Sequence, residues 1–113
     1  MYEIPKNLDE AIATLSSFDN FKTEVEKHDM DTFVAIFHFG LGMYIRNEWN
    51  LWGTQDYKSF DLYNWFVERG ISHADDMYSI IMKATWCKYH NVEYDLQQDI
   101  AMYKEFWSKQ NER

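Results

Sequence analysis

Residues 31–49 read DTFVAIFHFGLGMYIRNEW, and this stretch indicates the fold class more clearly than any other. If it forms one helix, in which each residue turns by about 100°, its apolar side chains point in nearly every direction. A helix that is hydrophobic all round is normally buried. The stretch therefore predicts a central helix against which the rest of the chain packs. Gly40 and Gly42 are poor helix residues, so their place in it indicates that another backbone or a ligand approaches closely.

The segments on either side also carry apolar residues at helical spacing, with capping and stop residues between them. Asn7 and Asp95 are suitable N-caps, and Gly70 and Asn91 are suitable stops. Together with the central helix, these segments predict an all-α protein, a single compact domain of five or six helices over residues 1–113. The further helices are expected at about 8–17, at about 19–28, between Ser59 and Gly70, between Ser72 and Asn91, and after Asp95.

The composition fits a folded domain rather than a disordered or disulfide-rich chain. A chain of 113 residues can bury a core of its own, and an aromatic share of 19% is far from that of a disordered chain. The single Cys excludes an internal disulfide and a Cys-rich zinc module. The N-terminus does not resemble a signal peptide and no apolar run approaches the length of a membrane span, so we expect a cytoplasmic location.

The charge balance bears on the kind of partner. With 11 Lys and Arg against 19 Asp and Glu, the formal net charge is -8. Such a surface repels phosphate backbones and anionic membranes, which disfavours a nucleic-acid polymer or a membrane as partner. It suits a protein with a basic surface, or solubility alone. The N-terminal third is the most acidic part, and Glu24 and Glu26 are candidate contacts within it.

Arg46 is the polar residue of the central stretch that most needs a partner. On one straight helix, His38 and Arg46 lie on the same side at positions i and i+8, and Trp49 follows at i+11. A buried arginine keeps its proton and therefore needs an anion. An internal ion pair with Asp75 or Asp76 is the favoured interpretation. A pocket for a small anionic or nucleotide-like ligand, lined by His38, Arg46 and Trp49, is the alternative.

Two stretches, FHFGLGMYIRNEWNLW and GISHADDMYSIIM, resemble a small bacterial family known as domain of unknown function 6794. The resemblance extends from about Asn7 to about Trp107, with Tyr44 and Ala74 as departures where the family commonly has Trp and Pro. It implies a compact domain and supplies no activity. The residues that match the family pattern, and that we take as candidate ligand-binding positions, are His38, Arg46, Asn47, Trp49, His73, Asp75 and Asp76.

Catalytic and metal-binding constellations are not evident from the residue spacing. Cys87 and His90 stand at i and i+3 on one expected helix, which gives only two of the three or four ligands that a metal site needs. A lone Cys on an aromatic-rich helix is usually a packing residue. The sequence also lacks a Gly-x-Ser-x-Gly elbow and a phosphate-binding glycine loop. We therefore expect no metal, no cofactor and no enzymatic activity, with an uncharacterised hydrolase as the third possibility.

Aromatic residues near the irregular stretch 50–58 suggest a binding surface. Trp52 and Tyr57 lie within this loop, and aromatic side chains on loops commonly form the centre of protein interfaces. The sequence therefore predicts a non-enzymatic, acidic, helical protein that binds another protein, for example as an inhibitor or immunity-type factor. The small-anion pocket at His38, Arg46 and Trp49 is the alternative.

Overall fold

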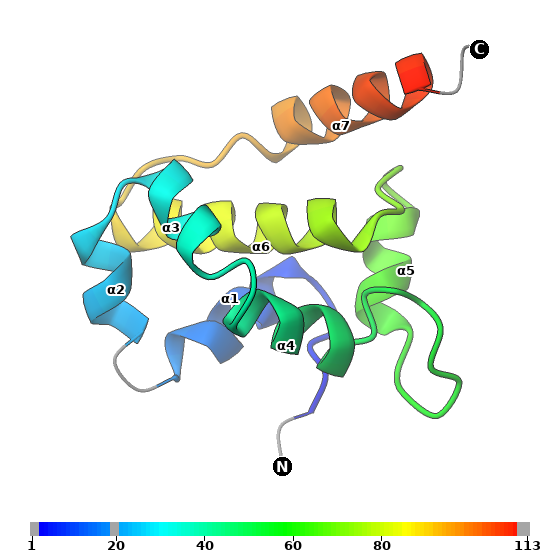
Figure 1. The fold of residues 1–113 in the computed structure, drawn as a ribbon, viewed down its shortest axis with the longest axis horizontal. Coiled ribbons are helices and arrows are strands. Elements are labelled where there is room, and N and C mark those ends of the chain that lie inside the picture. The colour runs from blue at the N-terminus through cyan, green and yellow to red at the C-terminus, as the bar shows by residue number, and fades with distance from the viewer. Residues whose placement is uncertain (1–2, 19–20, 111–113) are drawn as a thin grey trace.

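The chain folds into helices alone over the residues that the computed structural model describes, 3–18 and 21–110 (Figure 1). This confirms the all-α class. The predicted start of the second helix at residue 19 lies outside the described residues. Within the described ranges there are seven helices, more than the five or six expected: α1 Leu8–Ser16, α2 Phe21–Lys27, α3 Met30–Ile36, α4 Leu41–Glu48, α5 Asp61–Val67, α6 Ala74–Tyr89 and α7 Leu96–Gln110.

The expected central helix over 31–49 was wrong, because the stretch forms two helices. α3 ends at Ile36, a turn occupies 37–40, and α4 begins at Leu41. One straight helix would have to bury apolar side chains on every side. Breaking it lets each half turn a single face inward, so that Phe33 of α3 and Ile45 of α4 are both fully buried.

Gly42 is the residue that the break requires. Its N–H donates to the Phe37 carbonyl at 2.6 Å, which closes the turn onto the first residues of α4. A Cβ at position 42 would lie 2.7 Å from that carbonyl oxygen and 2.9 Å from the ring of Tyr78. The close approach predicted from the two glycines therefore occurs at Gly42, where a backbone and an α6 side chain both contact it. Gly40 has open space around it.

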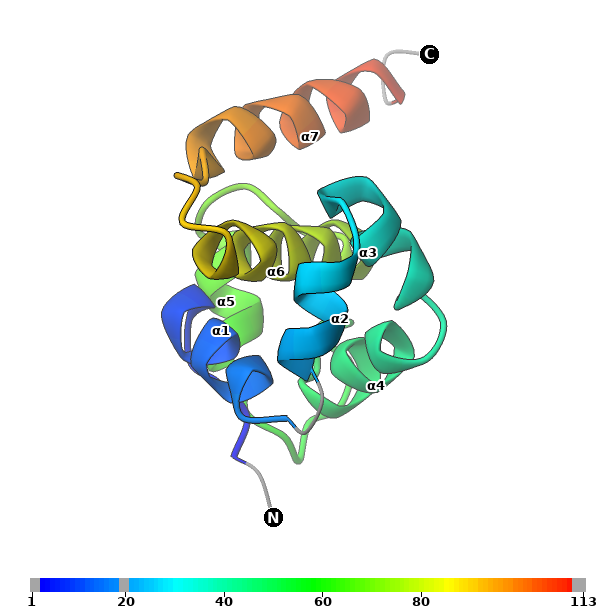
Figure 2. The same cartoon turned by 90° about the vertical axis from the view of Figure 1, so that its left-hand side faces the viewer.

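The buried hub of the fold is α6, and the helices before and after it cover its sides (Figures 1 and 2). It contacts α1, α2, α3, α4 and α7. Nine of its 16 residues are buried and cover more than half of its circumference, so α6 has the central place that was expected of 31–49. Its buried residues are Ala74, Met77, Tyr78, Ile80, Ile81, Met82, Ala84, Thr85 and Cys87.

Most of the predicted helix ends are found in the structure. Asn7 accepts the Glu10 N–H at 2.9 Å at the start of α1, and Asp95 caps α7 by accepting the Gln98 N–H at 3.0 Å. Gly70 and Asn91, at φ +91° and +54°, take the left-handed conformation common just after helices. These ends depend on short-range hydrogen bonds, which is why the sequence predicts them.

The two glycines provide a matched test of the turn. Gly42→Ala places its methyl group against a backbone oxygen and a packed ring, so it should destabilise the protein by about 1–3 kcal/mol, as overpacked sites do. Gly40→Ala meets no atom within 4 Å and has a negative φ of -78°, so it should change the free energy of unfolding little. Urea denaturation of both variants measures the difference. Equal effects would contradict the role given to Gly42.

Candidate functional site

Arg46 is buried and paired with α6. Its residue exposure is only 5%, and its Nε lies 3.4 Å from Asp75 Oδ1. Its guanidinium carbon lies 5.3 Å from the centre of the Tyr78 ring, within cation–π range. The ion pair expected with an acid at the start of α6 is therefore present at Asp75. That carboxylate is 62% exposed, so water also solvates it.

His38 contributes its backbone to this cluster. It lies in the 37–40 turn, and its carbonyl accepts a hydrogen bond from Arg46 Nη2 at 2.9 Å. Its ring packs edge-on against Tyr78, with 5.8 Å between ring centres, and against Phe39 at 5.0 Å. The shared helix face predicted for His38 and Arg46 does not exist, because the helix is interrupted between them. The two residues still meet, because the Arg46 side chain extends back toward the start of α4.

Tyr78 joins the same cluster to α3. Its hydroxyl donates to the Val34 carbonyl at 2.7 Å, and burial raises its pKa, so it remains a neutral donor. Asp75 and Tyr78 of α6, with Arg46 of α4, thus hold the end of α3 and the following turn. We call these three residues the clamp. The clamp fixes how the α3–α4 joint is presented to solvent.

The end of α3, the 37–40 turn, α4 and the loop after it each expose one large apolar side chain. Phe39 is 75% exposed, and Ile36, Met43 and Trp52 are each about half exposed. Phe39 lies in the 37–40 turn just before α4, Met43 and Asn47 are one helical turn apart on α4, and Trp52 is bonded to Asn47. We call Ile36, Phe39, Met43 and Trp52 the α4 ridge. Exposed apolar surfaces of this kind mark interaction sites.

Asn47 and Asn50 fix the loop that carries Trp52. Asn47 Oδ1 accepts the Trp52 indole N–H at 3.0 Å. Asn50 takes a left-handed conformation at φ +57°, and its side chain is bonded to the backbone of Gln55 and Ser59. These bonds cross the base of the loop, so Trp52 is held on an ordered segment. Asn47, predicted as a ligand residue, here orients an aromatic side chain.

Tyr57 extends the exposed surface at the far end of α4. It is 84% exposed, and its neighbour Lys58 pairs with Glu48 at 3.2 Å. Tyr57, Lys58 and Glu48 also border a hollow of about 530 Å³ that Ile4 helps to line. An exposed ring beside a hollow can contribute to a protein contact. This is the setting predicted for Tyr57 from its place in an irregular loop.

The remaining predicted ligand residues are not brought together with Arg46. Trp49 is 2% exposed and lies in the core, which removes its ring from any solvent-accessible pocket. His73 stacks on Trp107 of α7 at 3.5 Å, and Asp76 Oδ2 accepts the Trp107 indole N–H at 2.8 Å. The seven predicted residues are thus divided among the clamp and joint, the core, the loop and the α7 contact.

α7 is attached to the body of the protein mainly through α6. Besides the Trp107 contacts, Lys83 of α6 lies 3.6 Å from Asp99 and 3.4 Å from the Tyr103 hydroxyl. Burial by itself would lower the pKa of Lys83, but Tyr103 and Asp99 outweigh it and raise the pKa, so Lys83 stays charged. Ile100 is the buried residue of this helix. Polar and stacking contacts therefore carry much of the docking of α7.

The two acidic residues proposed for a partner contact lie on α2. Glu24 is 3.3 Å from His28, and Glu26 is 3.9 Å from Lys22, both at i, i+4 spacing along the helix. The Glu26 and Lys22 side chains are well exposed, so this pair is worth little to stability. Both acids can therefore be changed without disturbing the core.

The described residues provide neither a cluster of metal ligands nor a membrane-spanning helix. Over residues 3–18 and 21–110, no three His, Cys, Asp or Glu side chains are grouped so that they could hold a metal ion. Among the described helices, none has the length and apolar character needed to cross a bilayer. Cys87 is buried, and this burial raises its pKa, which makes its thiol a poor nucleophile.

Sequence reasoning identified Trp52 as a binding candidate and missed the other three residues of the α4 ridge. Ile36, Phe39 and Met43 were placed in the core because they belong to an apolar run that a straight helix would bury. The signal that could have identified them is the Gly40–Gly42 pair, because a break there turns the outer faces of both short helices to solvent.

A comparison with protein families gives one match. The model described as Domain of unknown function (DUF6794) matches residues 4–89, which run from before α1 to the end of α6. No curated protein and no solved structure matches the chain.

Arg46 and Asp75, the two charged residues of the clamp, should contribute unequally to the free energy of unfolding. Arg46→Met removes the bond to the His38 carbonyl and the contact with Tyr78, and should cost about 2–4 kcal/mol, as loss of a buried hydrogen-bonded charge does. Asp75→Asn should cost about 1 kcal/mol or less, because water solvates that carboxylate. Chemical denaturation of both single variants and the double variant measures their coupling. Fully additive effects would show that the pair makes no energetic contribution.

Asp76 allows a test by pH. Burial raises its pKa, although the Trp107 hydrogen bond acts in the opposite direction. A carboxyl whose pKa is higher in the folded state stabilises the protein below its unfolded pKa of about 3.9, and that contribution is lost as the pH rises through the folded pKa. Asp76→Asn keeps an acceptor for Trp107, so its stability relative to the parent should rise between pH 3 and pH 7. A relative fall over that range would mean that the ionised carboxylate stabilises α7 docking.

Proposed function

The chain belongs to the DUF6794 family of domains of unknown function, and we propose that it is a non-enzymatic module that binds another protein through the α4 ridge. The observation that carries the proposal is the group of exposed apolar side chains on a joint that the clamp holds in place. Interface centres are typically aromatic or apolar side chains on a rigid support, because little conformational entropy is lost when they bind.

The charge of the chain supports a partner with a basic surface. Its formal net charge of -8 attracts such a surface over several ångströms, and Glu24 and Glu26 are exposed enough to contribute. The ridge would then supply short-range contact, with Trp52 and Tyr57 at its loop end. An inhibitor or immunity-type role in the cytoplasm of a bacterium is the form of this function that we propose.

A small-anion pocket at His38, Arg46 and Trp49 receives less support. Trp49 is enclosed in the core, and two of the three guanidinium nitrogens of Arg46 already have partners within the protein. Arg46 Nη1 is buried without a hydrogen-bond partner among the described residues, but it lies against the backbone of Gly42. Its position fits the clamp better than a ligand site.

The ridge can be tested with two residues of the same type and similar exposure. A photoreactive methionine analogue at position 43 of the ridge, compared with one at position 102 on α7, should crosslink the partner preferentially from position 43. With the partner purified, Phe39→Ser should raise its dissociation rate by about tenfold or more, as loss of a hot-spot side chain does. Phe106→Ser is the matched control on α7 and should change the rate little.

The acidic residues of α2, Glu24 and Glu26, should affect the association rate constant. Glu24→Lys and Glu26→Lys should lower the association rate more than they raise the dissociation rate, and the effect should weaken as the Debye length falls from about 10 Å at 0.1 M salt. Equal effects of Phe39→Ser and Phe106→Ser on binding would refute the ridge as the interface. If neither Glu24→Lys nor Glu26→Lys changes the association rate at low salt, these two residues have no role in binding.

A further inference from the structure

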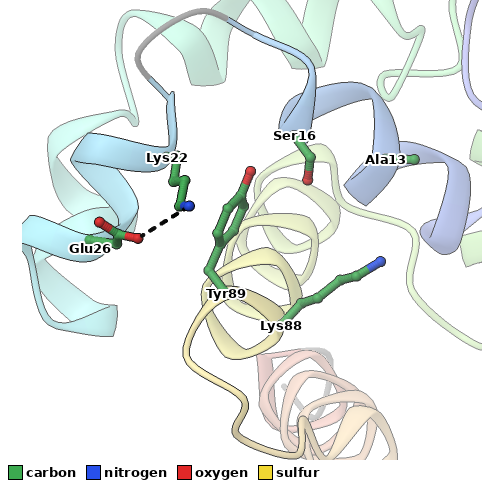
Figure 3. A pocket seen from close by; sticks show the side chains of 6 residues that line it. All are labelled: Ala13, Ser16, Lys22, Glu26, Lys88 and Tyr89. Atoms are coloured by element: carbon green, nitrogen blue, oxygen red, sulfur yellow. Dashed lines mark ion pairs between the residues drawn. The ribbon is translucent and has the colours of Figure 1, made fainter.

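A pocket lies between α1, α2 and the last turn of α6, among residues that are neither in the α4 ridge nor in the clamp (Figure 3). Its volume of about 620 Å³ is in the usual range for small-molecule sites, roughly 300–1,000 Å³. Because its walls come from three helices, its shape depends on how α2 is held against α6. The lining residues are Ala13, Ser16, Lys22, Glu26, Lys88 and Tyr89.

The α2 wall is held in place by two side chains, Trp86 in the last turn of α6 and His90 at its C-cap. The Trp86 indole N–H donates to the His28 carbonyl at 2.8 Å. His90 Nε2 lies 3.0 Å from the Val25 carbonyl, to which it donates, and its ring stacks on Trp86 at 4.0 Å. These long-range bonds join both the middle and the end of α2 to α6. The pocket is therefore formed before any ligand enters.

Two of the polar groups that line the pocket are hydrogen-bond donors without acceptors in residues 3–18 and 21–110, whereas the Ser16 hydroxyl donates to the Ile12 carbonyl at 2.8 Å. Within the described residues, the Lys88 ammonium group has no carboxylate partner and the Tyr89 hydroxyl makes no hydrogen bond. Lys22 is paired only with Glu26, at 3.9 Å and with both side chains well exposed. Figure 3 shows Lys22 and Lys88 on opposite sides of the Tyr89 ring. In a chain of net charge -8, this pocket gathers two ammonium groups against one carboxylate.

The pocket also has an apolar wall. The Tyr89 ring is half-buried, and its inner side packs near Phe21, with 6.3 Å between ring centres. Ala13 and the aliphatic parts of the two lysines add further apolar surface. A ligand that fits must therefore present acceptors to the ammonium groups and the hydroxyl, and an apolar body to the ring. A bare inorganic anion would satisfy only the first requirement.

We propose that this pocket binds a small organic anion, a phosphate ester or carboxylate attached to a flat apolar group of about one ring. The acidic group accepts from the Tyr89 hydroxyl, and the flexible Lys22 and Lys88 side chains approach it from the two sides of the ring, while the apolar group lies against one face of that ring. Glu26 opposes binding, because it is a negative charge in the same pocket and competes for Lys22. The site is separate from the α4 ridge, so either can exist without the other.

Phenyl phosphate is the test ligand, with inorganic phosphate and phenol as its two halves. Amide chemical shifts followed by NMR should show saturable binding of phenyl phosphate, with the largest changes at residues 13–16, 22–26 and 88–89. Phenyl phosphate should bind about tenfold more tightly than inorganic phosphate, because only the former buries an apolar ring. Phenol should bind more weakly than phenyl phosphate, because it lacks the charge.

Single substitutions then distinguish specific binding in this pocket from non-specific attraction of the anion to exposed lysines. Lys22→Gln and Lys88→Gln should each weaken phenyl phosphate binding by roughly fivefold, the size of a partly exposed ionic contact. Glu26→Gln should strengthen it, and Tyr89→Phe should weaken it. Lys109→Gln is the matched control, because Lys109 is as exposed as Lys22 and is likewise paired with a glutamate at i, i+4.

Three results would overturn the proposal. Shifts spread over all the exposed lysines, or an equal loss with Lys109→Gln and Lys22→Gln, would show non-specific ion association. Weaker binding of phenyl phosphate by Glu26→Gln would show that this carboxylate does not oppose the anion, contrary to the proposed site. All of these variants leave Phe39 and the rest of the ridge intact, so failure here would not bear on the ridge as a protein-binding surface; Glu26 alone is shared with the acidic face of α2.

Discussion

The burial of α6 is the constraint on which the rest of the structure depends. Nine of its 16 residues are buried, and they cover more than half of the circumference of the helix rather than a narrow stripe. A helix of this kind has to be covered from several sides to remove its apolar surface from water. The short helices α1 to α4 do this from one direction and α7 from another, which explains why a chain of this size uses so many short elements.

The start of α6 adds polar specificity to this apolar packing. Asp75 binds Arg46 of α4, Asp76 binds Trp107 of α7, and Tyr78 binds the backbone of α3. Apolar contact tolerates small displacements, whereas each of these bonds requires one position of its partner helix. Adjacent residues of one helical turn therefore orient three helices that lie on different sides of it. The exposed position of Phe39 follows from this arrangement, because the 37–40 turn is held from below.

The aromatic residues divide into three groups according to these constraints. Some fill the core, such as Phe33, Phe66 and Trp49. Others carry polar contacts between helices, as the indole groups of Trp86 and Trp107 do. The third group, represented by Phe39 and Tyr57, has neither role and stays exposed. The high aromatic content therefore serves both to hold the fold together and to form an exposed surface. Only the exposed aromatic residues are relevant to binding.

The sequence by itself determined the helical class and most helix ends, and it favoured the pairing of Arg46 with an acid at the start of α6 over a ligand pocket. These features depend on local periodicity, on capping residues such as Asn7 and on the inability of arginine to lose its charge. Only the tertiary structure decided that 31–49 is broken, that α6 is the hub, and that Asp75 rather than Asp76 meets Arg46. The reason is that periodicity describes the faces of a straight helix and carries no information on which neighbour covers each face. Gly42 contacts Tyr78, which lies 36 residues further along the chain. This long-range contact decides which apolar side chains stay exposed to solvent.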